Sequence, residues 1–250
     1  MHISVLVLAI IVFGAAFAQG FSGFGYGILA MAVLSLVVTD IERASVFVTL
    51  SVTVLIIALL IRSRRDVAID YRQAAMLFLG LLAGCPLGYW FVLRQGDMPA
   101  CRIIFGAVLI LFALNGLLKP HIRRHIPMAL APVFGVFSGL LSGAFSSGGP
   151  PIVLYLYAQE DDPRKALGTV QLVFLGASVY RLAIVGFSER GLTQDLLLSA
   201  AVMAPVAVVG TLAGYLATRK VSSRAFLLGV YALIVTAGAL NILKGLTPMR

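Results

Sequence analysis

Long apolar segments recur along almost the whole chain and leave only short polar intervals between them. Of its 250 residues, 60% are hydrophobic and 12% are charged, whereas soluble domains carry roughly 45–50% apolar and 25% charged residues. A soluble fold of this size has no interior large enough to remove so much apolar surface from water. The sequence therefore predicts an all-α polytopic membrane protein, with residues 1–250 forming a single membrane domain.

Ten apolar segments are assigned as helices, because a membrane-spanning helix needs about 20 apolar residues. The predicted segments are 3–19, 21–38, 44–61, 73–93, 102–118, 128–144, 149–158, 166–187, 195–217 and 225–243. A glycine-rich break joins the first and second segments, and another joins the sixth and seventh. Each of these two pairs therefore forms a hairpin, a broken helix or a re-entrant segment. The seventh segment is too short to cross the membrane alone, which favours a re-entrant half-helix there.

The distribution of basic residues predicts an orientation. Lys and Arg gather in the cytoplasmic loops of membrane proteins. The loops on one predicted side hold 12 of these residues and the opposite loops hold 6. The formal net charge of +9 is explained by such loops and does not indicate nucleic acid binding. With the more basic side in the cytoplasm, both termini lie outside.

The sequence repeats at a fixed offset, which indicates two related halves. Residues 84–89 (GCPLGY) resemble residues 210–215 (GTLAGY) at an offset of 126, and the two glycine breaks align at an offset of 123. We therefore expect two repeats of five segments, residues 1–120 and 128–250. Because five is odd, the second repeat is inverted, an arrangement found in transporters that bind substrate where broken helices meet.

The second break, Ser146-Ser147-Gly148-Gly149 before a double proline, is the first candidate for a binding site. Glycine and proline are costly inside a continuous helix, and proline suits the first turn of a new one. A half-helix beginning here would point free N–H groups into a cavity, which makes a site for anions. The alternative interpretation is that these small residues permit close helix packing.

The first break supplies the related candidates Ser22, Gly23 and Gly25, with Gln19 nearby. The glycine spacing resembles a dinucleotide-binding fingerprint, but no strand precedes it and no βαβ unit surrounds it. Close packing is again the alternative to a binding role.

Arg181 is the one basic residue well inside a predicted segment. A charge within the membrane indicates function, and the planar guanidinium group suits oxyanions. Arg181 lies six residues from the end of its segment, so its side chain is also long enough to extend to the membrane surface. Gln171, ten residues earlier, is a further candidate for substrate binding.

Acidic and histidine residues are confined to predicted loops or segment edges. The sequence therefore offers no pair for a metal ion and no hydrolytic triad, and we expect no cofactor, no metal and no enzyme activity. It also argues against proton coupling through a buried acid. Cys85 suggests thiol chemistry, but its repeat partner Thr211 favours a packing role, and no disulfide with Cys101 is expected.

Residues 20–27 (GFSGFGYG) resemble the first signature of the TauE/SafE sulfite-exporter family, and residues 143–151 (GAFSSGGPP) resemble the second. The resemblance covers nearly the whole chain, as two copies of the family's repeat. It implies transport, mostly outward, of sulfite, sulfoacetate or other organosulfur anions across the bacterial inner membrane.

These observations predict a secondary transporter that exports a small sulfur oxyanion bound between two helix breaks. An exported anion gains about 2.3 kcal/mol per charge per 100 mV in a cell that is negative inside, so the potential alone can drive export. The alternatives are an anion channel, an importer of a related compound such as thiosulfate, or a membrane-embedded sulfur-handling enzyme. The expected partners are the anion and the lipid bilayer; nucleic acid is excluded and homodimerisation is left open.

Overall fold

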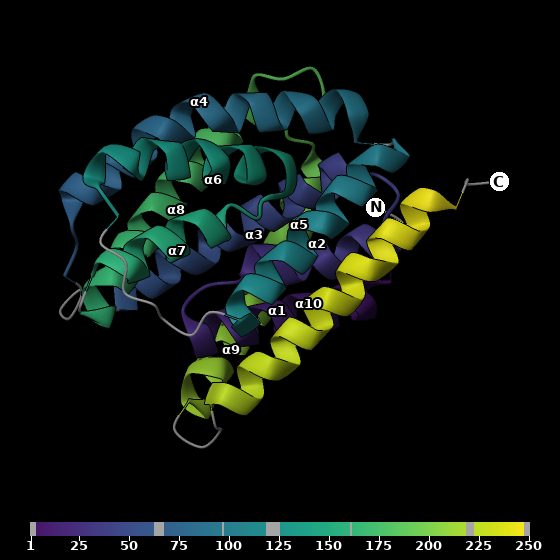
Figure 1. The fold of residues 1–250 in the computed structure, drawn as a ribbon. Helices are drawn as coiled ribbons and strands as arrows, with labels where there is room; N and C mark the ends of the chain where they lie inside the picture. Colours follow the sequence, from purple (N-terminus) through teal and green to yellow (C-terminus); the bar gives the residue numbers. More distant parts are fainter. Residues whose placement is uncertain are drawn as a thin grey trace.

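The computed structural model describes residues 4–62, 68–96, 98–118, 126–160, 162–218 and 223–247, and these contain helices and no strand (Figure 1). The α-helices are α1 (Val5–Ser22), α2 (Tyr26–Val37), α3 (Ile41–Arg62), α4 (Tyr71–Gln95), α5 (Pro99–Leu118), α6 (Ala131–Phe145), α7 (Gly149–Gln159), α8 (Pro163–Gly186), α9 (Gln194–Ala217) and α10 (Ser223–Leu246), and a short 3-10 helix, Met128–Leu130, precedes α6. Within these described ranges, eight helices are long and apolar enough to cross a membrane. The prediction of an all-helical, multi-pass membrane protein is confirmed.

The two short helices, α2 and α7, follow the predicted breaks. They contain 12 and 11 residues, so at about 1.5 Å per residue each is shorter than the roughly 30 Å hydrocarbon core. The prediction for α7 agrees with this length, but the prediction that the second segment begins at residue 21 is wrong. The first helix continues to Ser22, and α2 begins only at Tyr26. The number of complete crossings stays a prediction.

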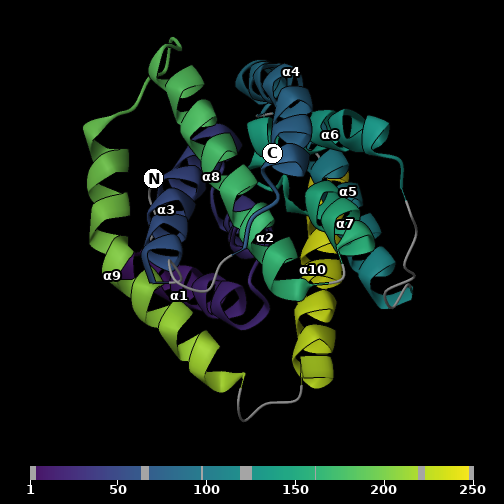
Figure 2. The ribbon, with the colours of Figure 1, turned by 90° about the vertical axis from the view of Figure 1, so that its left-hand side faces the viewer.

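The helices pack in pairs that join the two halves of the chain. The helix α4 lies against α6, α1 against α9, and α5 against α10 (Figure 2). Between these pairs, α3 packs on α8 and α9, and α8 packs on α3 and α4. Glycines permit the close contacts: a Cβ atom at Gly84 would lie 2.2 Å from the carbonyl oxygen of Val136, and one at Gly214 would lie 2.0 Å from that of Phe17.

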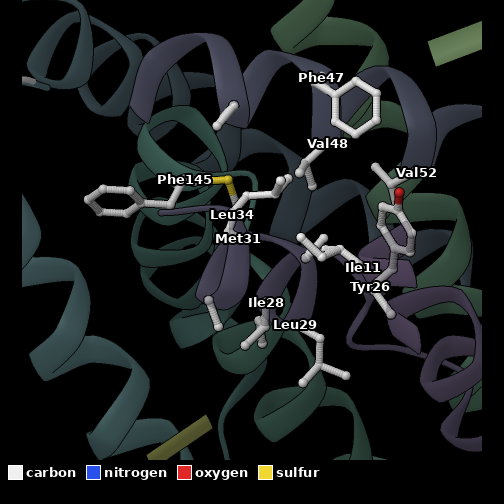
Figure 3. Packing of buried hydrophobic residues seen from close by; sticks show 14 of the residues in the cluster. Ile11, Tyr26, Ile28, Leu29, Met31, Leu34, Phe47, Val48, Val52 and Phe145 are labelled. Atoms are coloured by element: carbon white, nitrogen blue, oxygen red, sulfur yellow. The ribbon is translucent and has the colours of Figure 1, made fainter. Parts of the chain in front are cut away.

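The short helix α2 lies in the core of the protein. Its apolar side chains are packed among residues of α1, α3 and α6 (Figure 3). At its C-terminal end, Lys244 Nζ donates to the carbonyl oxygen of Leu36 at 2.6 Å, and Arg102 Nη2 donates to those of Val38 and Thr39 at 3.3 and 3.2 Å. The helix α5 begins three residues earlier than predicted, so Arg102 lies in its first turn, and the side chain is buried. Two cations thus bind the negative end of the α2 dipole.

Candidate functional site

A pocket lies between the two helix breaks, where α2 and α7 begin. Seven of the ten predicted site residues line it: Gln19, Gly25, Ser146, Ser147, Gly148, Gly149 and Arg181. The remaining wall consists of residues from α2, α3, α6 and α8. Segments that are far apart in the sequence therefore meet at one cavity, as the anion-site hypothesis requires.

The two breaks touch each other through their backbones. A Cβ atom at Gly27, in the first turn of α2, would lie 2.1 Å from the carbonyl oxygen of Ser146 at the second break. Gly25, the N-cap of α2, has a φ of 107° and open space beside it. A side chain at Gly25 would be strained, and Gly25 lines the pocket.

The second break turns sharply between α6 and α7. Ser146 ends α6 in the left-handed region, with a φ of 54°, and its N–H donates to the carbonyl oxygen of Ser142 at 3.0 Å. Ser147 Oγ donates to the carbonyl oxygen of Phe145 at 3.0 Å. The N–H groups of Gly148 and Gly149 have no hydrogen-bond partner within the described part of the chain. The next two residues are prolines and have no N–H, so these two glycines supply the available backbone donors at the start of α7.

Arg181 lies in α8, and its side chain is held inside the protein. Its residue is 1% exposed, so the side chain does not extend to the exterior. Arg181 Nε donates to the carbonyl oxygen of Gly143 at 3.0 Å, Nη1 to that of Ser45 at 2.8 Å, and Nη2 to Ser45 Oγ at 2.6 Å. A further short hydrogen bond joins Nη1 to Thr49 Oγ1.

All of these acceptors are neutral, and no carboxylate of the described residues forms an ion pair with Arg181. These four hydrogen bonds occupy four of the five guanidinium N–H groups and leave one N–H on Nη2. Arg181 also lines the pocket. A buried charge without a counter-ion is costly. An anion in the pocket would lower that cost by supplying the missing negative charge.

The first break is organised differently from the second. Gln19 Oε1 accepts a hydrogen bond from the N–H of Tyr26 at 2.9 Å, so its side chain caps α2 as well as lining the pocket. Ser22, Gly23 and Gln171 do not line this pocket. Gly23 ends α1 with a φ of 84°, and its carbonyl oxygen accepts from Gln171 Nε2 at 2.6 Å. Ser22 Oγ donates to the carbonyl oxygens of Ala18 and Phe24. These contacts fix the shape of the first break.

Comparison with known proteins decides the family. The family model for the sulfite exporter TauE/SafE matches residues 8–241. The chain belongs to this family. A TauE/SafE relative from Cupriavidus necator, described as "Probable sulfite/organosulfonate exporter TauE", is 30% identical over 200 residues, which cover 78% of this chain and 77% of that protein. No solved structure matches the chain.

Membership of TauE/SafE confirms the resemblance seen in residues 20–27 and 143–151, and it makes the chain a membrane transporter and not an enzyme. Cys85 is buried, does not line the pocket and forms no disulfide. The described residues include no group of three or more His, Cys, Asp or Glu side chains that could hold a metal ion.

Sequence reasoning missed three polar residues that line the pocket of this TauE/SafE transporter, namely Thr49, Ser142 and Ser178. Two of them could have been found from their helical spacing to predicted site residues. Ser142 and Ser178 precede Ser146 and Arg181 by four and three residues, which places each pair on one face of a helix. Thr49 lies on α3, and its Oγ1 donates to Ser146 Oγ at 3.0 Å across 97 residues of sequence. Nothing in the sequence alone relates those two positions.

Glu42 differs from the prediction that no acid is buried. It lies at a segment edge, as predicted, but it is only 3% exposed, because Tyr89 and neighbouring helices cover it. Tyr89 Oη donates to Glu42 Oε1 at 3.1 Å, and the Tyr89 ring lies 5.8 Å from Arg181 Cζ. The TauE/SafE chain therefore does contain a buried acid near the pocket.

Ser146 offers a test that separates binding from folding. A left-handed backbone costs a non-glycine residue about 1 kcal/mol, so Ser146→Gly should leave thermal stability unchanged or raised while removing the hydroxyl. Ser146→Ala removes the same hydroxyl and keeps the strain. We expect both variants to bind the anion about fivefold more weakly, the effect of one hydrogen bond of about 1 kcal/mol. Isothermal titration and thermal denaturation of the purified variants measure the two effects. Unchanged binding in Ser146→Gly would show that the hydroxyl serves only packing.

Proposed function

We propose that this TauE/SafE transporter exports a small sulfur oxyanion, either sulfite or an organosulfonate such as sulfoacetate, through the pocket between the two helix breaks. The observation that carries the proposal is the buried Arg181 side chain, which lines the pocket and meets only neutral acceptors. The relative from Cupriavidus necator, named as a sulfite/organosulfonate exporter, supports this class of substrate.

The chemistry of the lining suits an oxyanion. Such an ion has several acceptor oxygens and no donor when it is fully ionised. The pocket offers the remaining Arg181 N–H, the Gly148 and Gly149 N–H groups and the hydroxyls of nearby serines. One cation combined with neutral donors attracts an anion without surrounding it by fixed charge, so release remains possible, as transport requires.

The packing of the helices supports the inverted repeat as part of this proposal. If α1 to α5 correspond to α6 to α10, the contact of α1 with α9 corresponds to the contact of α6 with α4, and both occur. Gly23 and Ser146 are equivalent at the offset of 123, and both end a helix in the left-handed region. The proposal places the protein in a bacterial inner membrane with both termini in the periplasm, because that orientation puts the more basic loops inside.

Export of an anion without a coupling ion is electrogenic. We therefore expect sulfite efflux from proteoliposomes to rise when the interior is made negative, since each charge gains about 2.3 kcal/mol per 100 mV. Potassium diffusion potentials set with valinomycin and labelled sulfite measure this dependence, and protein-free liposomes are the control. Efflux that is indifferent to the imposed potential would contradict the electrogenic mechanism.

Counterflow separates a transporter from a channel in the same vesicles. Vesicles that contain a transporter and are preloaded with unlabelled sulfite accumulate labelled sulfite transiently, whereas vesicles that contain a channel do not. Sulfoacetate, thiosulfate, taurine and sulfate tested as competitors define the substrate. If none of the sulfur anions competes and none is transported, the proposed substrate class is wrong.

A further inference from the structure

A cluster of polar side chains links the pocket to one end of the molecule. Arg190, in the loop between α8 and α9, lies 3.2 Å from Asp40 Oδ2 and 3.4 Å from Glu42 Oε2. Asp40 precedes α3, and Glu42 lies in the first turn of α3. Tyr89 of α4 completes the cluster, since its Oη bonds to Glu42 and lies 2.9 Å from Ser188 Oγ. Four separate elements are therefore joined at this end; we call these residues the Arg190 cluster.

One face of α3 continues from this cluster into the pocket. Glu42, Ser45 and Thr49 are spaced by three and four residues, so they lie on the same side of the helix. Ser45 and Thr49 bind Arg181, which itself lies over the Tyr89 ring. The polar groups thus form a continuous path from the surface at Arg190 to the pocket wall.

A second cluster lies at the opposite end of α8. Lys165, near the start of α8, lies 2.7 Å from Glu160 Oε2 and 3.3 Å from Asp70 Oδ2. Asp70 ends the loop that follows α3, and its N–H donates to Thr169 Oγ1 on α8 at 2.9 Å. The N–H of Gln73 holds the pKa of Asp70 below its usual range, with Lys165 contributing, so Asp70 is ionised at neutral pH. We call these residues the Lys165 cluster.

The two clusters occupy equivalent places in the two halves of the chain. Each joins the corner after a short helix, α2 or α7, to the loop that precedes a long helix, α9 or α4. The Arg190 cluster joins the start of α3 to the loop after α8, and the Lys165 cluster joins the start of α4 to the start of α8. The 22 residues of α3 span about 33 Å at 1.5 Å per residue. The pocket residues of α3 and α8 lie between the ends of these helices.

We propose that the Arg190 and Lys165 clusters are the two gates of the transporter, each closing the path between the pocket and one side of the membrane. This inference rests on the proposed function, because it assigns the control of access to the same pocket. Both clusters are formed in this structure. The ion pairs are partly exposed, with Arg190 and Lys165 side chains 38% and 34% exposed. Such pairs are weak enough to break during each cycle.

A cysteine in the pocket reports on the gates without any assumption about the substrate. Ser178 lines the pocket and is 8% exposed, so Ser178→Cys introduces a shielded thiol of similar shape. Membrane-impermeant maleimide is added to spheroplasts or to inverted vesicles, which present opposite faces. The native Cys85 and Cys101 are buried, and the wild-type protein measures their background labelling.

In this background, Arg190→Gln should raise the rate of Ser178→Cys labelling from one membrane face by about tenfold, and Lys165→Gln should do so from the other face. Glu42→Gln should act like Arg190→Gln, and Arg190→Lys should keep labelling slow. Glu189→Gln is the control, because it removes a charge next to Arg190 in the sequence. Glu189 is exposed and forms no ion pair among the described residues, so the labelling rate should not change.

Unchanged labelling in folded Arg190→Gln and Lys165→Gln proteins would overturn the proposal, as would increased labelling from the same face in both. Thermal denaturation of each variant shows whether an increased labelling rate results from unfolding. The gate proposal and the substrate proposal can be refuted independently. Labelling that follows the gates without sulfur anion transport refutes the proposed substrate, whereas sulfite transport with unaltered labelling refutes the gates.

Discussion

Arg181→Gln is expected to lower the affinity for sulfite at least about 30-fold. Truncating one partner of a buried, hydrogen-bonded charge pair costs about 2–5 kcal/mol, and the lower value corresponds to this factor. Glutamine keeps a polar group at the site but removes the charge that attracts the anion. Titration calorimetry of the purified variant, with transport in proteoliposomes, measures the loss.

The same substitution removes hydrogen bonds from the carbonyl oxygens of Gly143 and Ser45, which destabilises the protein. Binding is therefore measured on the monodisperse fraction from size-exclusion chromatography. Arg181→Lys is the matched variant, because it keeps the charge and loses the planar fork; we expect an intermediate affinity. A folded Arg181→Gln protein that binds sulfite as the wild type does would show that Arg181 has only a structural role.

Gly148→Ala is expected to reduce transport by about two orders of magnitude. A Cβ atom at this position would lie 1.9 Å from Ser142 Oγ and 2.5 Å from the carbonyl oxygen of Ser138, which is too close for any side chain. Ser138 Oγ also donates to the carbonyl oxygen of Gly148 at 2.6 Å, so the break has little room to shift. Displacing the start of α7 moves the N–H groups of Gly148 and Gly149 away from the ligand, and misplacement of about 1 Å can cost about 100-fold.

Gly229→Ala is the control for this substitution. Gly229 lies in α10, where an added Cβ atom meets nothing within 4 Å, and alanine favours a helix. Flux should be unchanged in Gly229→Ala and lost in Gly148→Ala, when both are compared at equal protein per vesicle. Normal flux in Gly148→Ala would show that the second break does not bind the substrate.

The sequence located most helices because a membrane helix needs a long apolar segment, and each end was predicted to within five residues. It placed the end of the first helix and the start of the second too early, because glycines serve two purposes. Gly20 does not end α1; a Cβ atom there would lie 2.0 Å from the carbonyl oxygen of Thr211, so this glycine permits contact with α9. Gly23 and Gly25 have positive φ angles and form the break itself. Packing glycines and break glycines look alike until the neighbouring helix is known.

The sequence predicted the site residues that carry a local signal. It missed the residues that reach the site only because distant segments pack together. The second break and Arg181 carry local signals, namely a double proline and a charge within an apolar segment. The contact of Thr49 with Ser146 and that of Glu42 with Tyr89 join residues 97 and 47 positions apart. These contacts depend on how α3 packs against α6 and α4, which no local pattern specifies. The buried acid was overlooked for the same reason.

The two cations at the end of α2 have a mechanical consequence for the transport cycle. Arg102 of α5 and Lys244 of α10 bind the carbonyl groups of Ser35 and Leu36 in the last turn of α2, and Arg102 also binds those of the two residues that follow. The helices α5 and α10 also pack against each other. Eight of the 12 residues of α2 are buried, whereas only three of the 11 residues of α7 are. The two short helices therefore differ in rigidity despite their similar place in each half. We therefore expect α2 to move little during the transport cycle and the larger displacement to fall on α7 and its neighbours.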